Sequence, residues 1–441
     1  MATALPERLS AADASNIEID SPDQVNSFLM AGHLGVGGFV RGPDDVDLDL
    51  LRAAIRERIE PSASGAGDLV RFTQRVRLHP RPLVWEGCEP DLTWHVRRTE
   101  PVAGEQGFAT LVAESMTTPL PLDRPLWELL VVPGATATGP GVVLRLHHCV
   151  SDGVGAVSLV GHLFGADAQP EERSRAAPSA QSPRPGSHSP RPTRPRTRGR
   201  DRLRTLAASV ARTTAVFRAT VPRTVLLGPI GGHRGVALVD VPVEPLAAAA
   251  RAQGATVNDV LLAAVAGSVE ATLRADGHPV PDVLPASVPV ALAERGSSGN
   301  AVGVMLAPLP SGVDDIGRRI RLIGAVTRTA KDAARAQGTF ELTRSRLGSR
   351  AFAWLARRQR FIALFVTNVR GPAQRMHLAG APLLRAWPVA PIQGNVRFGV
   401  AAMSYDGRLG VAVHVDADAL KAEVAGRALE AELRRVAEWD G

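Results

Sequence analysis

Two adjacent histidines, His147 and His148, make up the part of the sequence best suited to chemistry. They end an apolar run that begins at Val142, and Asp152 and Gly153 follow a few residues later. A neutral imidazole can accept a hydroxyl proton near neutral pH, because its unperturbed pKa lies close to that range. General-base help of this kind is worth about 10²- to 10⁴-fold in rate. The run therefore indicates a general base at the end of a strand.

Strand geometry gives the two histidines different surroundings. The segment 141–148 is predicted to be a strand, and successive side chains of a strand point to opposite faces. His148 should share one face with Leu146, whereas His147 should share the other with Arg145. The two imidazoles are therefore expected to have different roles.

The same residues allow other interpretations. The two histidines could simply be polar residues at a strand end, and Asp152, before the turn at Gly153, could either fix the loop or orient an imidazole. A metal site is not predicted, because adjacent strand residues diverge and no HExxH or Cys/His set completes one. Cys149 is disfavoured as a nucleophile, because neighbouring strand residues point apart and cannot easily form a thiolate–imidazolium pair.

The excess positive charge of the chain is concentrated in one stretch. The 441 residues carry a formal net charge of +7. Between Pro170 and Arg204, ten arginines stand against three acidic residues, which accounts for the whole excess. Pro, Ser and Arg dominate 166–200, so we predict a solvated linker there, between an N-terminal part (1–165) and a C-terminal part (201–441). The remainder is nearly neutral and has few aromatic residues, so nucleic-acid binding is not expected.

Hydrophobic periodicity predicts a mixed α/β chain. Helical spacing of apolar residues occurs in 46–59, 108–116, 258–274, 316–335 and 417–439. Extended segments are predicted at 238–243 and 301–306. Strands over 398–405 and 409–415 should form a hairpin around Asp406 and Gly407. A basic amphipathic helix is predicted over 203–221, either packed on its own domain or attached to an anionic membrane surface.

Cysteine usage and the lack of long apolar runs indicate the compartment. Only two cysteines occur, Cys88 and Cys149, which is too few for a disulfide framework and fits a reducing environment. The first residues show no basic region followed by an apolar run, so no secretory signal is expected. No segment approaches the ~20 uninterrupted apolar residues of a spanning helix. We therefore expect a cytoplasmic protein whose contact with a membrane is at most peripheral.

Three further motifs accompany the spacing HHxxxDG. In order along the chain they are Pro125-Leu126-Trp127, Asn258-Asp259 and Asn368-Val369-Arg370-Gly371-Pro372. With these motifs the chain resembles the bacterial wax ester synthase/diacylglycerol acyltransferase family, itself similar to condensation domains and chloramphenicol acetyltransferase. The resemblance spans nearly the whole chain outside the linker. It implies two α/β subdomains of the chloramphenicol acetyltransferase type, which form a pseudo-dimer with a tunnel between them.

The resemblance also implies an activity and roles for residues. His148 would be the catalytic base, His147 its companion, and Asp152 a residue that holds the motif loop, beside Gly153, in shape. Acyl-CoA would be the co-substrate, no cofactor would be needed, and the acceptor would be diacylglycerol or a long-chain alcohol, giving triacylglycerol or wax ester. We assign Asn258 as the candidate donor to the oxyanion that develops on the thioester. A lipid acceptor makes a membrane or lipid-droplet surface an expected partner.

The sequence departs from the family pattern at two places. The family commonly begins with Asp-Ala-x-Phe-Leu, whereas here Asp13-Ala14 is followed by Asn16 in the place of the Phe. Loss of this aromatic residue is expected to reshape the acyl or acceptor entrance. Arg370 stands where the family's Asn-Val-Pro-Gly-Pro has its first Pro, so the turn before Gly371 should differ in stiffness. Neither change touches the base.

The motif residues also have purely structural explanations. Thr256 and Asp259 fit a capping box at a helix start, so Asn258 and its neighbour could serve local structure alone. Trp127 fits a core anchor better than a ligand contact. Gly371 with Pro372 fits a turn that positions a crossover between the two halves.

Two other functions remain compatible with these motifs. An enzyme of the same superfamily could acylate an amine, a sugar or a carrier-bound natural-product intermediate, because the base chemistry is shared. A non-catalytic binding protein could also retain the fold, although the intact His147, His148, Asp152 and Gly153 argue against it.

Overall fold

The computed structural model describes residues 7–21, 23–60, 69–78, 82–151, 153–165, 221–291, 302–337 and 354–439. The predicted linker over 166–200 lies outside these ranges, as do Asp152 and all but the last residue of the predicted helix over 203–221. The described parts of Met1–Ala166 and Val221–Gly441 pack into one compact unit.

Six strands form the sheet that carries the histidine motif, in the order β12-β13-β2-β7-β6-β5. They are β2 (Ser27–Leu34), β5 (Val96–Arg98), β6 (Trp127–Val132), β7 (Gly141–His147), β12 (His377–Leu378) and β13 (Ala381–Val389). β7 lies between β2 and β6 and is antiparallel to both. All seven of its residues are buried. The strand that ends in the motif is therefore held by hydrogen bonds on both sides.

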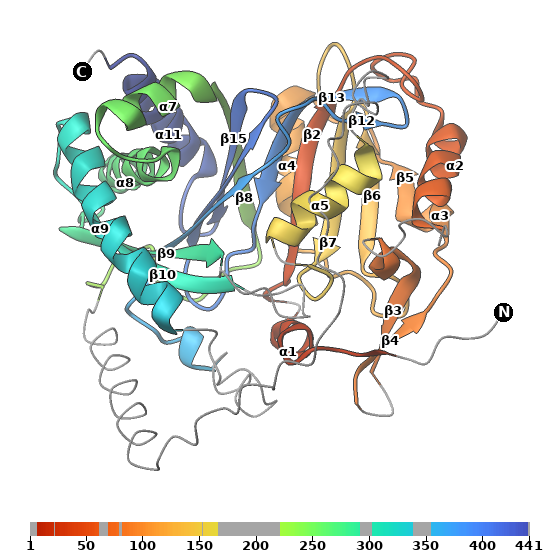
Figure 1. The fold of residues 1–441 in the computed structure, drawn as a ribbon, viewed down its shortest axis with the longest axis horizontal. Coiled ribbons are helices and arrows are strands. Elements are labelled where there is room, and N and C mark those ends of the chain that lie inside the picture. The colour runs from red at the N-terminus through yellow and green to blue at the C-terminus, as the bar shows by residue number, and fades with distance from the viewer. Residues whose placement is uncertain are drawn as a thin grey trace, which may run out of the picture. The chain divides into compact units, whose positions relative to one another are not determined.

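Helices cover both faces of this sheet (Figure 1). α2 (Leu48–Ile59) and α5 (Gly153–Phe164) pack on one face, and α4 (Gly104–Ser115) packs on the other. α2 begins after Asp47, whose side chain caps the helix by accepting a hydrogen bond from the N–H of Leu50. The buried side chains of α2 recur at each turn and comprise Leu51, Ile55 and Ile59.

Shorter elements complete the N-terminal part. They are β1 (Glu7–Arg8), α1 (Ala11–Ile19), the 3₁₀ helix η1 (Val70–Thr73), β3 (Gln74–Arg77), β4 (Val84–Gly87) and α3 (Leu92–His95). The strands among them form a separate sheet in the order β1-β4-β3. Ser10 caps α1 by accepting a hydrogen bond from the N–H of Asp13. This helix carries Asn16, the residue that replaces the family's Phe.

The second six-stranded sheet has the order β10-β9-β11-β14-β15-β8. Its strands are β8 (Arg234–Pro242), β9 (Val283–Ala291), β10 (Val302–Pro310), β11 (Leu364–Arg370), β14 (Phe398–Tyr405) and β15 (Arg408–Asp416). Four helices pack with one of its faces in a continuous apolar core: α7 (Val243–Ala252), α8 (Val257–Ala275), α9 (Ile316–Gln337) and α11 (Ala422–Ala437). The chain is thus of mixed α/β class, with helices on a sheet in each half, as the sequence predicts.

The predicted elements are found with small shifts at their ends. The hairpin of β14 and β15 turns through Asp406 (φ 45°) and Gly407 (φ 73°), the positive-φ pair that the sequence indicates. β7 ends one residue earlier than predicted, because the chain turns after His147, whose carbonyl accepts the N–H of Val150 at 2.9 Å. The last helix begins at Ala422 and not at 417, because the preceding residues form a turn.

A crossover joins the two sheets directly after β11. The chain leaves the second sheet at Gly371 and Pro372, forms β12 and β13 in the first sheet, and returns as β14. The N–H of Gly371 donates to the carbonyl of Ser404 at 2.9 Å, and a Cβ at Gly371 would lie only 2.6 Å from that oxygen. Glycine is therefore required here, and the crossover lies where the sequence predicts it.

The strand that crosses over also connects the cores of the two halves. Tyr405 of β14 donates its hydroxyl hydrogen to the carbonyl of Leu383 in β13 at 2.9 Å. The indole N–H of Trp387, also in β13, donates to the carbonyl of Val239 in β8 at 2.9 Å. Both aromatic side chains are buried. The second sheet is therefore fixed to the first by β13 on the face opposite its helices.

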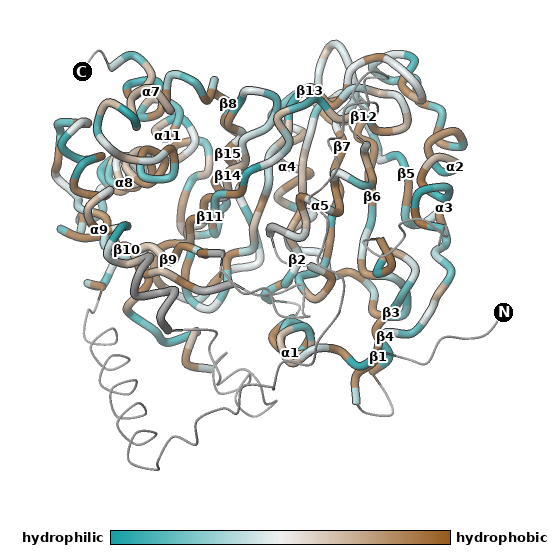
Figure 2. The backbone as a smooth tube through the Cα atoms, in the orientation of Figure 1, coloured by the Kyte–Doolittle hydropathy of each residue, from teal (hydrophilic) through white to brown (hydrophobic). Residues whose placement is uncertain are grey.

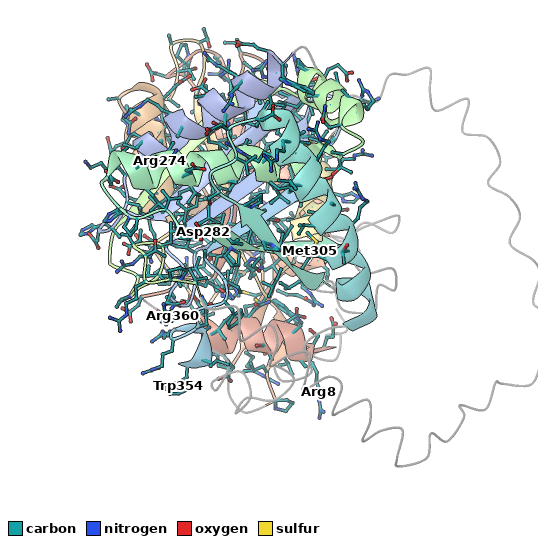
Figure 3. All side chains as sticks on the ribbon, turned by 90° about the vertical axis from the view of Figure 1, so that its left-hand side faces the viewer. Arg8, Arg274, Asp282, Met305, Trp354 and Arg360 are labelled. Atoms are coloured by element: carbon teal, nitrogen blue, oxygen red, sulfur yellow. The ribbon has the colours of Figure 1, made fainter. Side chains whose placement is uncertain are left out.

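Apolar residues run along strands of both sheets, such as β7 and β9, whereas the helices carry both polar and apolar residues (Figure 2). Met305 of β10 is buried beside α9, whereas Trp354, which is 60% exposed, projects from the surface (Figure 3). Among the described residues, no single helix is long and apolar enough to span a membrane. The helices α7 and α8 meet the length and hydropathy criteria only when they are taken together, and they are bent by 99° relative to each other.

Candidate active site

Side chains alternate along β7 as the sequence predicts, and this alternation separates the two histidines. Leu144 and Leu146 join the core formed with α2 and α5, whereas Val143 packs with α4. Arg145 lies on the α4 side, where its guanidinium reaches the end of that helix. His147 continues the Arg145 side by this alternation.

A buried ion pair fixes the end of β7. Arg145 is 3% exposed and lies 2.5 Å from the carboxylate of Glu128, which is 2% exposed and belongs to β6. The same guanidinium donates to the carbonyls of Ser115 and Thr118, each at 2.5 Å, at the end of α4. Burial lowers the pKa of Arg145, and the charge of Glu128 opposes that shift. Loss of Arg145 is therefore expected to be destabilising, because it removes the buried partner of Glu128 and the donor to two buried carbonyls.

His147 is fully buried, and each of its two ring nitrogens has a polar neighbour. Its Nδ1 accepts a hydrogen bond from the backbone N–H of Cys149 at 3.1 Å. An imidazole nitrogen that accepts carries no hydrogen, so the ring hydrogen of neutral His147 is on Nε2. That nitrogen lies 3.3 Å from a carboxylate oxygen of Asp20, in the loop after α1.

His148 lies at the boundary between protein and solvent. Its ring packs edge-on against Phe28, with 5.0 Å between ring centroids, and part of its surface remains exposed. Its backbone is held on both sides: the N–H donates to the carbonyl of Asn26 at 3.0 Å, and the carbonyl accepts from Asn16 Nδ2 at 3.1 Å. Burial, with a smaller contribution from the charge of His147, lowers the pKa of His148 to about 4. The imidazole is therefore uncharged at neutral pH.

The start of α8 contains the predicted capping box. Thr256 accepts a hydrogen bond from the N–H of Asp259, and Asp259 accepts one from the N–H of Thr256 at 2.8 Å. The second oxygen of Asp259 accepts from the hydroxyl of Thr327 at 2.6 Å. Asp259 is thus occupied by structural contacts and is 2% exposed.

Asn258, between these two capping residues, points toward β11. Its Oδ1 lies 3.5 Å from Nδ2 of Asn368, and both side chains are partly exposed. The contact uses the oxygen of Asn258, so its amide hydrogens are directed elsewhere. The structure therefore brings together two asparagines that are 110 residues apart in sequence.

β11 also connects this pair to the histidine motif. Gly153 begins α5, and a Cβ placed on it would lie 3.6 Å from the side chain of Val369, the neighbour of Asn368. Val369 packs against the core of the N-terminal half, whereas Leu364 and Val366 of the same strand belong to the core around α8. Arg370 ends the strand and is exposed. HHxxxDG and the Asn368 motif therefore meet where the two halves are in contact.

The segment Pro125-Leu126-Trp127 supports the histidines from the neighbouring strand. All three residues are buried, and the carbonyl of Leu126 accepts a hydrogen bond from the N–H of His147 at 3.1 Å. The indole N–H of Trp127 donates to the carbonyl of Phe72 at 3.0 Å. Trp127 thus has the position of a core anchor.

Cys149 is unsuited to nucleophilic chemistry. Its side chain is 2% exposed and packs in a small apolar cluster with Trp85 and Leu126. Burial raises the pKa of the thiol well above its ordinary value, so the reactive thiolate is suppressed. The structure agrees with the sequence argument against this residue.

Three polar residues around the motif were missed from the sequence. Asp20 faces His147, Asn26 binds the backbone of His148, and Gln393 donates to the side chain of Asn26 at 2.6 Å. They come from the loops before β2 and β14, more than a hundred residues from the motif in each case. No local pattern marks them, because their roles depend only on tertiary contacts.

The fold is shared with solved structures of the condensation-domain type. The wax ester synthase/diacylglycerol acyltransferase from Marinobacter aquaeolei VT8 is similar with a TM-score of 0.68 at 22% identity, over 98% of this chain and 100% of that chain. The first condensation domain of the CDA synthetase gives 0.57 at 15% identity, over 99% and 96%. A starter condensation domain of rhizomide synthetase, solved with C8-CoA and Leu-SNAC, gives 0.54 at 14% identity, over 98% and 94%. The fold class is therefore that expected from the motifs.

Sequence similarity identifies the family within this class. The model of the wax ester synthase/diacylglycerol acyltransferase catalytic domain matches residues 9–261, and that of the family's C-terminal domain matches 298–436. A putative diacylglycerol O-acyltransferase from Mycobacterium bovis and the probable diacylglycerol O-acyltransferase tgs1 from Mycobacterium tuberculosis are each 28% identical over 435 residues, 93% of this chain and 91% of the relative. The chain belongs to the wax ester synthase/diacylglycerol acyltransferase family and is an acyltransferase.

Proposed function

We propose that the chain is an acyl-CoA-dependent O-acyltransferase that esterifies a lipid alcohol, diacylglycerol or a long-chain alcohol, with His148 as the general base. The proposal depends on the state of His148. Its imidazole is uncharged at neutral pH, and the residue is partly exposed. Its backbone N–H and carbonyl are both held by hydrogen bonds. Relatives named diacylglycerol O-acyltransferase support the acceptor class. The fold neighbour solved with C8-CoA supports the donor class.

In the proposed reaction, acyl-CoA and the alcohol meet at His148 in a tunnel between the two halves. His148 takes the hydroxyl proton while the alcohol oxygen attacks the thioester carbonyl. The tetrahedral intermediate collapses, the C–S bond breaks, and the protonated imidazole returns its proton to the CoA thiolate. The products are an ester, triacylglycerol or wax, and free CoA. The steps balance without a metal, a cofactor or an acyl-enzyme.

The oxyanion of the intermediate needs a donor that is already in place, and Asn258 is our candidate. Its oxygen faces Asn368, which leaves its amide hydrogens to donate. The capping box on either side of it holds its backbone at the start of α8. Removal of one oxyanion donor typically lowers kcat by about 10²- to 10³-fold.

Substitution of the base tests this function directly. In His148→Ala we expect loss of at least about 10²-fold in turnover, measured by release of the CoA thiol, with an unchanged circular dichroism spectrum. His162→Ala, which removes an exposed histidine of α5, is the matched control and should keep wild-type turnover. Wild-type turnover in His148→Ala would exclude this residue as the base.

The identity of the acceptor is tested separately. We expect diacylglycerol or a long-chain alcohol to be acylated faster than amines, sugars or carrier-bound intermediates in a panel analysed by mass spectrometry. The fold is shared with condensation domains, so a faster reaction with an amine would retain the base chemistry and reassign the substrate. Absence of turnover across the whole panel would favour a binding protein.

Access to a lipid acceptor implies peripheral contact with a membrane or lipid-droplet surface from the cytoplasm. The ten arginines between Pro170 and Arg204 are suited to an anionic surface. Deletion of 170–200 should weaken sedimentation with anionic vesicles and leave turnover of short, dispersed substrates in place. Equal sedimentation of the full chain and the deletion variant would show that this stretch does not contribute to membrane binding.

A further inference from the structure

The carboxylate of Asp20 contacts the motif histidine His147, and both of its oxygens have a neighbour. One oxygen accepts the N–H of Asn26 at 2.7 Å. The other lies 3.3 Å from Nε2 of His147. The carboxylate is largely covered, since 15% of its side chain is exposed. It therefore faces the motif from the loop that precedes β2.

From Asp20, two routes of polar contacts lead to the backbone around His148: the first consists of hydrogen bonds, and the second begins with the 3.3 Å ion contact to His147. In the first, Asp20 binds the N–H of Asn26, and the carbonyl of Asn26 accepts the N–H of His148. In the second, Asp20 faces Nε2 of His147, and Nδ1 of that ring accepts the N–H of Cys149. The two consecutive backbone N–H groups at the end of the motif strand are thus both fixed through one carboxylate.

The second route depends on which nitrogen of His147 carries the hydrogen. A carboxylate next to an imidazole nitrogen favours the hydrogen on that nitrogen and leaves the other free to accept. With the hydrogen on Nε2, Nδ1 can receive the N–H of Cys149, as the structure has it. With the hydrogen on Nδ1, two N–H groups would face each other, and the turn after His148 would have to move.

We propose that Asp20 is a positioning residue for the acyl transfer: it fixes the tautomer of His147 and, through that ring and Asn26, the place of His148. This inference rests on the proposed function, because it assigns a means of placing the proposed base. Asp20 does not touch the substrate, so its loss should act on kcat and leave KM largely unchanged. A misplacement of about 1 Å in a catalytic group can cost about 10²-fold in rate.

The first test is kinetic. Asp20→Ala should lower kcat by about 10²-fold with KM for acyl-CoA within about twofold, and Asp20→Asn, which keeps the shape and loses the charge, should lie between it and the wild type. Asp23→Ala changes an exposed aspartate of the same loop and is the matched control, with wild-type kcat expected. Wild-type kcat in Asp20→Ala would overturn the proposal.

The second test reads the tautomer and needs no substrate. In ¹⁵N-histidine-labelled wild-type protein, the His147 signal, assigned by its absence in His147→Gln, should show a protonated Nε2 and an unprotonated Nδ1. In Asp20→Ala the two tautomers should become mixed. A wild-type ring protonated on Nδ1, or an unchanged tautomer in Asp20→Ala, would overturn the proposal.

Failure of this inference can be told from failure of the proposed function. If His148→Ala is inactive while Asp20→Ala keeps both kcat and the tautomer, only the role of Asp20 is lost. If His148→Ala turns over normally, the proposed base is wrong, whatever the tautomer of His147. A merely structural role for Asp20 would lower the free energy of unfolding without changing the tautomer, which also counts against the proposal.

Discussion

The two sides of the candidate site are held in different ways. On the histidine side, a buried strand, a buried ion pair and hydrogen bonds to consecutive backbone groups fix His147 and His148. On the asparagine side, Asn258 is placed by a helix cap and by one contact of 3.5 Å with Asn368. The difference indicates that the proposed proton-transfer group is preorganised, whereas the candidate oxyanion donor has freedom to adjust to the substrate.

The largest effect should come from breaking the buried support of the histidine side. Arg145→Met removes the donor to the carbonyls of Ser115 and Thr118 and leaves Glu128, among the described residues, with Arg97 as its ionic partner at 2.6 Å, so the free energy of unfolding should fall by about 3 kcal/mol. Arg98→Met, at an exposed position of β5, should change it by less than about 0.5 kcal/mol. Urea unfolding followed by circular dichroism measures both. Equal stability of the two variants would show that the ion pair does not hold the strand.

The asparagine side should respond in rate more than in stability. Asn258→Ala should lower kcat by about 10²-fold, because it removes the proposed donor and leaves Thr256 and Asp259 to cap α8. Asn368→Ala, which only orients Asn258, should have a smaller effect on kcat. Steady-state kinetics with a parallel unfolding curve separates the two quantities. A larger loss of kcat in Asn368→Ala than in Asn258→Ala would indicate that Asn368, and not Asn258, is the oxyanion donor.

Buried histidines outside the motif should make stability depend on pH. Burial lowers the pKa of His33, His95 and His414 to about 4 in the folded protein, from 6.5 as the ordinary value. Between these two values the unfolded chain binds more protons than the folded chain. Stability is therefore complete above pH 6.5 and falls as the pH is lowered toward 4, by roughly 1 to 2 kcal/mol per histidine at pH 5.

One substitution isolates this contribution. His33 packs between Phe108 and Trp387, so His33→Phe should retain the ring packing and reduce the loss of stability between pH 7 and pH 5 by roughly 1 to 2 kcal/mol. His162→Phe, at an exposed position, should show the same pH dependence as the wild type. Identical curves for all three proteins would contradict the lowered pKa of His33.

The smallest effect should come from the helix cap itself. Thr256→Ala removes the side chain that accepts from the N–H of Asp259 and should lower the free energy of unfolding by about 1 kcal/mol. Thr256→Ser keeps the hydroxyl and should recover most of that loss. If thermal unfolding shows Thr256→Ala to be as stable as the wild type, the capping hydrogen bond does not stabilise the start of α8, where Asn258 lies.

Local patterns were sufficient to predict much of the fold. The Asp406-Gly407 turn, the capping box of Thr256 and the apolar periodicity of α2 each depend on residues close in sequence, and each is present in the structure. The strand ending at the histidines was also predicted, because the apolar alternation along β7 is short-range. What such patterns cannot show is that β12 and β13 leave the second sheet to extend the first.

The candidate site was predictable only in its linear motifs. The spacing HHxxxDG and the family resemblance identified His147, His148, Asn258 and Asn368, and the structure shows which of these are neighbours. The contacts of Asp20, Asn26 and Gln393 were not predictable, because each residue joins the site from a distant loop through one or two polar contacts. Residues of this kind leave no periodicity in the chain.

Chemical rescue tests the central claim, that the imidazole of His148 removes the acceptor proton, most directly. His148→Gly should be inactive with acyl-CoA and a lipid alcohol, and added imidazole should restore turnover in proportion to the concentration of its uncharged form. His162→Gly should show no response to imidazole. Full activity of His148→Gly without imidazole, or an inactive variant that imidazole does not rescue at any pH while still binding acyl-CoA, would contradict the account.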